Sequence, residues 1–133
     1  MLSLLLDTHI LTWWRLDTGK LSAAQIRAIE AEERRGHGVA ISAITLRELA
    51  VAVDRGRLSV GQPLDVWLEG IERSPLITVL PITSRIALES VRLGPDFPKD
   101  PADQIIVATA LCHGLRLLTA DERIRRWGKV LLV

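Results

Sequence analysis

Residues 2–8, Leu-Ser-Leu-Leu-Leu-Asp-Thr, join a short apolar run to an acid and a hydroxyl. An apolar run of this length, broken only by Ser3, indicates a strand that is buried on both faces. Asp7 and Thr8 end the run, and the apolar spacing of residues 10–16 indicates that a helix follows at once. A buried strand that leads directly into a helix is typical of a parallel α/β sheet.

The same alternation continues along the whole chain. Glycines, prolines and capping residues mark the ends of the segments, as where Pro101 follows Asp100 and Gly114 follows the next apolar stretch. The pattern predicts one α/β domain over residues 1–133, with three α/β/α layers and a central, mostly parallel sheet of about five strands. The expected strands are 2–6, 39–41, 77–80, 115–118 and 130–133, and the expected helices are 10–16, 23–35, 43–55, 63–71, 84–93, 101–113 and 122–127.

Composition narrows the classes of function. A net charge of +1 argues against a protein that coats DNA, and only five aromatic residues, four Trp and one Phe, argue against a surface that stacks single-stranded bases. The single cysteine, Cys112, allows no internal disulfide, which favours a reducing compartment. No apolar run approaches the ~20 residues of a membrane span. We therefore expect a cytoplasmic protein with no membrane association.

Four acids lie where a parallel sheet would bring them together. Each follows an apolar, strand-like run or lies near the start of the helix after one, and they are Asp7, Glu48, Asp103 and Asp121. Strand ends and helix starts meet at the carboxyl edge of such a sheet, which is where ligands bind. Each acid also has an ordinary interpretation as a helix cap, a turn residue or a solvated side chain. Asp103, for example, could simply complete a capping box with Asp100.

Their combination points to a metal site. Two unit charges about 4 Å apart repel by about 4 kcal/mol at an effective dielectric constant near 20, whereas a domain of this size is stable by only ~5–15 kcal/mol. A cluster of four anions therefore needs protons or a cation, and hard oxygen ligands select Mg²⁺ or Mn²⁺. Such an ion suits phosphoryl chemistry. Thr8 and Thr119 flank two of the acids and could orient them, although each could also be a capping hydroxyl.

Other chemistries of α/β sheets lack their motifs here. The sequence contains neither a Gly-x-Gly-x-x-Gly turn after the first strand nor a Gly-Lys-Ser/Thr phosphate loop. A phosphatase with a nucleophilic Asp at the strand end would normally carry a second Asp two residues later, where His9 stands. The three histidines have no mutual spacing that suits a metal site. These absences leave the four acids as the candidate centre.

Four blocks of sequence resemble the PIN-domain nucleases. They are LLLDTHILTWW at 4–14, ISAITLRELA at 41–50, KDPADQIIVATA at 99–110 and LLTADERI at 117–124. Their order and the size of the chain are similar to those of the VapC toxins of bacterial toxin–antitoxin pairs. One block alone would be weak support, but four in order, each with an acid, are specific and span nearly the whole chain.

The resemblance implies a PIN-like fold and a Mg²⁺- or Mn²⁺-dependent endoribonuclease toxin that hydrolyses RNA with metal-activated water. It implies that Asp7, Glu48, Asp103 and Asp121 are the catalytic, metal-binding quartet, with Asp100 and Thr119 as outer-shell or orienting groups. It also implies inhibition by a cognate antitoxin and a homodimer or larger toxin–antitoxin complex. One departure is Gln104, which stands where this subgroup often has Arg.

Basic residues gather near the fourth acid. Because cationic side chains contact phosphates, this segment is a candidate RNA-binding surface, and its candidate residues are Arg123, Arg125, Arg126 and Lys129. A solvated helix face is the alternative interpretation. For the whole chain, the alternatives are a catalytically silent PIN-like scaffold, from which we would expect one or more acids to be missing, and a nuclease of structured DNA. The sequence does not specify which RNA is cleaved or whether one or two ions bind.

Overall fold

The computed structural model describes all residues, 1–133, and contains four strands in one parallel sheet with the order β3-β2-β1-β4. Leu5 in the middle of β1 pairs with Ala40 of β2 on one side and with Leu117 of β4 on the other. The central strand is therefore covered along both edges. The strands are β1 (Leu4–Leu6), β2 (Val39–Ser42), β3 (Ile77–Leu80) and β4 (Arg116–Leu118).

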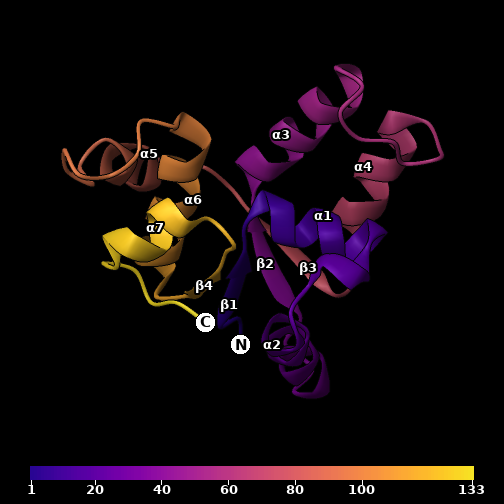
Figure 1. The fold of residues 1–133 in the computed structure, drawn as a ribbon, viewed down its shortest axis with the longest axis horizontal. Helices are drawn as coiled ribbons and strands as arrows, with labels where there is room; N and C mark the ends of the chain where they lie inside the picture. The colour runs from indigo at the N-terminus through magenta and orange to yellow at the C-terminus, as the bar shows by residue number, and fades with distance from the viewer.

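Helices connect the strands and cover both faces of the sheet (Figure 1). Local signals set their ends: Ser22 and Gln25 form a capping box, Asp100 caps the helix that Pro101 begins, and Gly114 ends that helix with a left-handed φ of 64°. The helices are α1 (Thr8–Leu16), the 3₁₀ turn η1 (Thr18–Lys20), α2 (Ala23–Arg34), α3 (Ala43–Asp54), α4 (Leu64–Arg73), α5 (Ser84–Ser90), α6 (Pro101–His113) and α7 (Glu122–Trp127).

Two apolar cores lie on opposite faces of the sheet. Because side chains alternate along a strand, Leu4 and Leu6 enter one core with α1 to α4, and Leu5 enters the other with α6 and α7. Helix α5 packs against α6. All three leucines are fully buried, and burying each side chain contributes about 1.5–3 kcal/mol. These layers confirm the predicted three-layer α/β architecture. None of the helices has the length and apolar composition needed to cross a bilayer.

The structure shortens three of the expected elements by two residues or more. The first strand begins at Leu4 rather than residue 2, and α5 ends at Ser90 rather than near residue 93. The expected last strand, 130–133, is only an isolated parallel bridge between Leu117 and Leu132. Its hydrogen bonds join the N–H and the carbonyl of Leu117 alone to this segment, at 2.7 and 3.2 Å, which is too little pairing for a strand.

The strand order places a topological switch point beside β1. From β1 the chain proceeds to β2 and β3 on one side, and β4 then pairs with the other side of β1. In open parallel sheets, ligands bind beyond the carboxyl ends of the strands at such a point. Asp7 directly follows β1, and its N–H donates to the carbonyl of Leu118 at the end of β4 at 3.1 Å. The first acid therefore lies at the switch point.

We expect Gly38→Ala to destabilise the protein far more than Gly56→Ala does. Both glycines have a positive φ, 65° and 71°, which costs an L-residue roughly 1–2 kcal/mol. A Cβ at residue 38 would also lie 2.5 Å from the carbonyl oxygen of Leu76, which accepts the N–H of Val39, whereas a Cβ at residue 56 meets open space. Urea unfolding of both variants measures the difference, and equal losses would show that the close approach to Leu76 is unimportant.

Candidate functional site

Asp7 is the buried acid of the candidate site. Its side chain lies at the N-cap of α1, is 6% exposed, and accepts a hydrogen bond from the N–H of Ile10 at 2.9 Å. Its other oxygen accepts the hydroxyl of Thr119, which is itself buried and accepts the N–H of Asp121 at 3.0 Å. Thr119 therefore joins the end of β1 to the turn that follows β4. Burial raises the pKa of Asp7 despite the hydrogen bonds from Thr119 and Ile10.

Arg123 holds the third and fourth acids together. One nitrogen of its guanidinium, Nη2, lies 2.9 Å from Asp121 Oδ2 and 3.3 Å from Asp103 Oδ2. Asp121 caps α7 by accepting the N–H of Arg123 at 2.8 Å, and Asp103 lies in the first turn of α6. The hydrogen bonds from Arg123 lower the pKa of Asp121. A positive charge therefore already sits between these two carboxylates.

Glu48 enters the site from the middle of α3. It is half-buried, and the hydroxyl of Thr8 at the start of α1 donates to its carboxylate. The same hydroxyl lies 3.1 Å from that of Thr45, one helical turn before Glu48. Burial raises the pKa of Glu48, and the charge of Asp100 raises it further. Thr8 thus orients the second acid much as Thr119 orients the first.

The acids perturb one another, which shows that they share one region. Burial, together with the negative charges of Asp100, Asp121 and Glu48, raises the pKa of Asp103 to about 7 against the opposing effect of Arg123. Asp7 in turn feels the charge of Asp121. Asp100 caps α6 by accepting the N–H of Asp103 at 3.1 Å, so it stands next to the group as a further anion. The structure therefore brings all four predicted acids to the same edge of the sheet.

The donor set fits a hard divalent cation in its chemistry, although the side chains are not closed around one point. No three Asp, Glu, His or Cys side chains are placed so that they could share one ion. The four acids supply only carboxylate oxygens, which Mg²⁺ and Mn²⁺ prefer, and the shared contact of Arg123 shows that a cation suits the space between Asp103 and Asp121. An ion bound there has to displace or accommodate the guanidinium of Arg123.

The predicted RNA-binding residues separate into two groups. Arg123, Arg126 and Lys129 line one hollow of about 540 Å³ next to the acids. Arg125 lies apart: it lines a different hollow, and its Nη1 donates to the carbonyl of Val133 at 3.2 Å. Gln104 donates to the carbonyl of Pro98 at 3.4 Å and thereby contacts the loop before α6.

Two features of this edge were missed by the sequence analysis. Lys99 lines the hollow beside Arg123, and its position directly before Asp100 was the signal that could have suggested it. The pairing of Arg123 with two of the acids was also missed, because Asp103 lies twenty positions away in the chain.

His9, directly after Thr8, lowers the pKa of Asp7 and of Glu48 through its charge, though less than their hydrogen bonds do.

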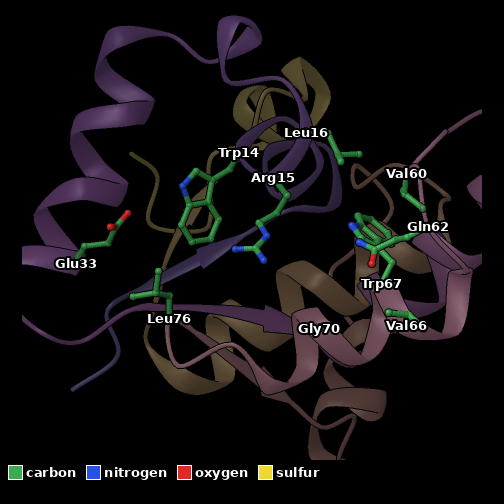
Figure 2. A pocket seen from close by; sticks show the side chains of 10 residues that line it. All are labelled: Trp14, Arg15, Leu16, Glu33, Val60, Gln62, Val66, Trp67, Gly70 and Leu76. Carbon is green, nitrogen blue, oxygen red and sulfur yellow. The ribbon is translucent and has the colours of Figure 1, made fainter.

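A larger hollow of about 600 Å³ lies away from the acids (Figure 2). The C-terminal half of α1, the end of α2, the segment before α4 and α4 itself line it, with the rings of Trp14 and Trp67 in its walls and the guanidinium of Arg15 between them. None of the four acids contributes to it. The volume of a hollow therefore does not identify the candidate site here, whereas charge and strand topology do.

Comparisons with known proteins identify the family of this chain. A family model described as "PIN domain" matches residues 4–130. Ribonuclease VapC22 of Mycobacterium tuberculosis (strain ATCC 25618 / H37Rv) is 37% identical over 125 residues, which cover 94% of this chain and 92% of that protein.

Solved structures show the same fold. The crystal structure of VapBC2 from Rickettsia felis, bound to a promoter DNA fragment, contains a chain that matches with a TM-score of 0.74 at 17% identity, covering 100% of this chain and 98% of that one. A toxin–antitoxin complex from Klebsiella pneumoniae contains a chain that matches with a TM-score of 0.63 at 28% identity, covering 98% and 96%.

We expect Thr119→Val to raise the pKa of Asp7 and to lower stability by roughly 1–3 kcal/mol. The variant loses the donor to the Asp7 carboxylate and the acceptor of the Asp121 N–H, whereas Thr119→Ser keeps both. Titration of the Asp7 carboxyl by NMR, together with urea unfolding, measures the two effects. The hydroxyl would have no such role if the Val and Ser variants behaved alike.

We also expect the stability of the metal-free protein to fall as the pH rises from about 4 to about 7. The pKa of Asp103 in the folded chain, about 7, lies above its ordinary value of 3.8, so the folded state binds more protons in this window. Urea unfolding at pH 5 and pH 8 in EDTA measures the loss, which Asp103→Asn should reduce. Glu69→Gln, an exposed change on α4, serves as the control. If Asp103→Asn lost as much stability between pH 5 and pH 8 as the parent does, the crowding of the acids would be contradicted.

Proposed function

The chain belongs to the PIN-domain family, and from this membership and its four convergent carboxylates we propose that it is a Mg²⁺- or Mn²⁺-dependent endoribonuclease. We propose further that it acts as the toxin of a toxin–antitoxin pair. The observation that carries the proposal is the excess of negative charge at the switch point, where Arg123 is the only cation paired with the acids. A site of this kind is stable only with bound protons or with a further cation.

The relatives support the choice of RNA as substrate. Ribonuclease VapC22 is named as a ribonuclease, and the match to it extends over 94% of this chain. The four carboxylates lie in the matched span of the PIN model, residues 4–130, so the shared region includes the whole candidate site. A silent scaffold has no need to keep all four acids, and a nuclease of structured DNA remains the alternative that a direct assay addresses.

The roles of the residues follow from their contacts. The oxygens of Asp7, Glu48, Asp103 and Asp121 would hold the ion. A bound Mg²⁺ or Mn²⁺ supplies a water of lowered pKa and stabilises charge on the phosphodiester oxygens. Thr119 and Thr8 fix the carboxylates of Asp7 and Glu48 through their hydroxyls, and Asp100 adds negative charge from the N-cap of α6.

A cognate antitoxin is the protein partner that we propose. The Klebsiella pneumoniae structure is a toxin–antitoxin complex, and its matched chain is 28% identical to this one over nearly the full length. The excess of carboxylates offers an inhibitor a clear means of blocking the site, because a basic side chain placed there would neutralise the acids. A homodimer, or a larger assembly with the antitoxin, is part of the same proposal.

Asp7→Asn and Asp103→Asn should each abolish RNA cleavage, with a loss of roughly a hundredfold or more, because each removes a negative ligand at the centre of the site. Cleavage of a labelled RNA in Mg²⁺ is measured beside that of flap DNA of the same sequence. Glu69→Gln should cleave as the parent does, and urea unfolding should show that all variants fold.

The outcomes separate the alternatives. Cleavage of RNA by Asp7→Asn at the parental rate would overturn the proposal, and preferential cleavage of the flap DNA would favour the DNA nuclease. Calorimetric titration with Mn²⁺ adds a readout that is independent of activity. A silent scaffold should bind no Mn²⁺ in a carboxylate-dependent manner, whereas the nuclease should bind it and Asp103→Asn should bind it more weakly.

A further inference from the structure

A basic hollow borders the acidic edge on the side of α7. Its volume is about 540 Å³, and two walls form it: the loop before α6, with Asp96, Pro98 and Lys99, and the end of α7 with the turn after it, with Arg123, Arg126, Trp127 and Lys129. Four cationic side chains thus surround a space that contains one carboxylate. The whole chain has a net charge of only +1, so this concentration of positive charge is local.

The two walls are fixed relative to each other by packing. The buried ring of Phe97 in the loop meets the ring of Trp127 edge to face, with centroids 5.0 Å apart and planes at 85°. Gly128 then reverses the chain with a φ of 68°, and the Nζ of Lys129 lies 5.9 Å from the centre of the Trp127 ring. The hollow is therefore formed before any ligand arrives.

Three of the four cations of the hollow have no acidic partner within the chain, the exception being Arg123. Lys99, Arg126 and Lys129 take part in no ion pair, and the only side-chain hydrogen bond among them joins Arg126 Nε to the carbonyl of Glu122 at 3.4 Å. Cations that converge without forming ion pairs indicate an anionic ligand, since their mutual repulsion otherwise opposes the arrangement. Lysine and arginine together are the usual contacts of a phosphate.

The position of the hollow identifies the phosphate that it fits. Arg123 lines the hollow and also contacts Asp103 and Asp121, and Lys99 directly precedes Asp100 in the chain. The basic and acidic sites therefore share a border. We propose that the hollow binds the backbone of the single-stranded RNA substrate at a phosphate beside the one to be cleaved, through Lys99, Arg126 and Lys129. This inference rests on the proposed nuclease function, and it names the subsite that positions the substrate.

The chain provides a matched control in Arg125. It has the same charge and lies on the same short helix as Arg126, but it lines a different hollow and donates to the carbonyl of Val133. If α7 attracted RNA only through its overall charge, removing Arg125 or Arg126 would weaken binding equally. If the hollow is a defined subsite, only the removal of Arg126 weakens binding. Arg27, an exposed cation on α2 that lines neither hollow, tests the effect of removing a charge outside the proposed subsite.

Binding is measured in EDTA, which prevents metal-dependent cleavage, with a short fluorescein-labelled oligouridylate and fluorescence anisotropy. Each phosphate contact to a single strand contributes about 0.7 to the slope of log K against log salt, which corresponds to about a fivefold change in affinity at 0.1 M salt. Lys99→Gln, Arg126→Gln and Lys129→Gln should each weaken binding by about fivefold, and the triple variant should flatten the slope by about two. Arg125→Gln and Arg27→Gln should change the affinity by less than about twofold.

Several results would overturn the subsite. They are equal losses in Arg125→Gln and Arg126→Gln, no loss in the triple variant, and no binding of the oligouridylate by the parent. A glutamate-rich peptide that displaces the RNA and binds more tightly would also overturn it in favour of a protein ligand. Cleavage in Mg²⁺ by the same variants separates this inference from the proposed function. If the parent cleaves RNA and the triple variant binds and cleaves RNA as strongly as the parent does, only the proposed subsite is contradicted. If the parent does not cleave RNA, the proposed nuclease function is contradicted, whatever the binding measurements show.

Discussion

The buried carboxylate of Asp7 is the constraint on which the arrangement of the site depends. A carboxylate that is 6% exposed is costly unless its oxygens are hydrogen-bonded, and here the partners come from the first turn of α1 and from Thr119 beyond β4. These contacts hold together the carboxyl ends of two adjacent strands at the switch point. Because Thr119 also accepts the N–H of Asp121, the position of the first acid determines that of the fourth.

Much of the fold could be predicted because its signals are local. The apolar run that contains Leu4–Leu6 is too short for a helix and is buried on both faces, and Pro101 and Gly114 mark the ends of α6 within the sequence itself. The four acids could be predicted as neighbours for a related reason, since parallel topology alone brings strand ends and helix starts to one edge. That reasoning needs no knowledge of individual side-chain contacts.

The remaining features depend on contacts between distant segments. Nothing local shows that Thr8 donates to Glu48, forty positions away, or that Arg123 pairs with two acids. Because residues three apart on a helix share a face, the sequence alone places Arg123 and Arg126 together and Arg125 on another face. The sequence does not reveal which of these faces borders the acids. The segment after α7 likewise has the composition of a strand, yet it forms only one bridge.

Another acid shows why the charge balance, and not the mere presence of carboxylates, distinguishes the site. Glu32 is fully buried, but Ser3, Arg35, His37 and Arg116 surround its carboxylate, so its charge is satisfied within the chain and its role is structural. At the switch point, by contrast, Arg123 alone offsets four carboxylates, while three unpaired cations lie in the neighbouring hollow. Folding by itself would favour bringing these opposite charges together. Keeping these charges apart costs stability. The separation leaves one surface that can bind a cation and an adjacent surface that can bind an anion, and a metal-dependent enzyme that acts on a phosphate backbone requires both.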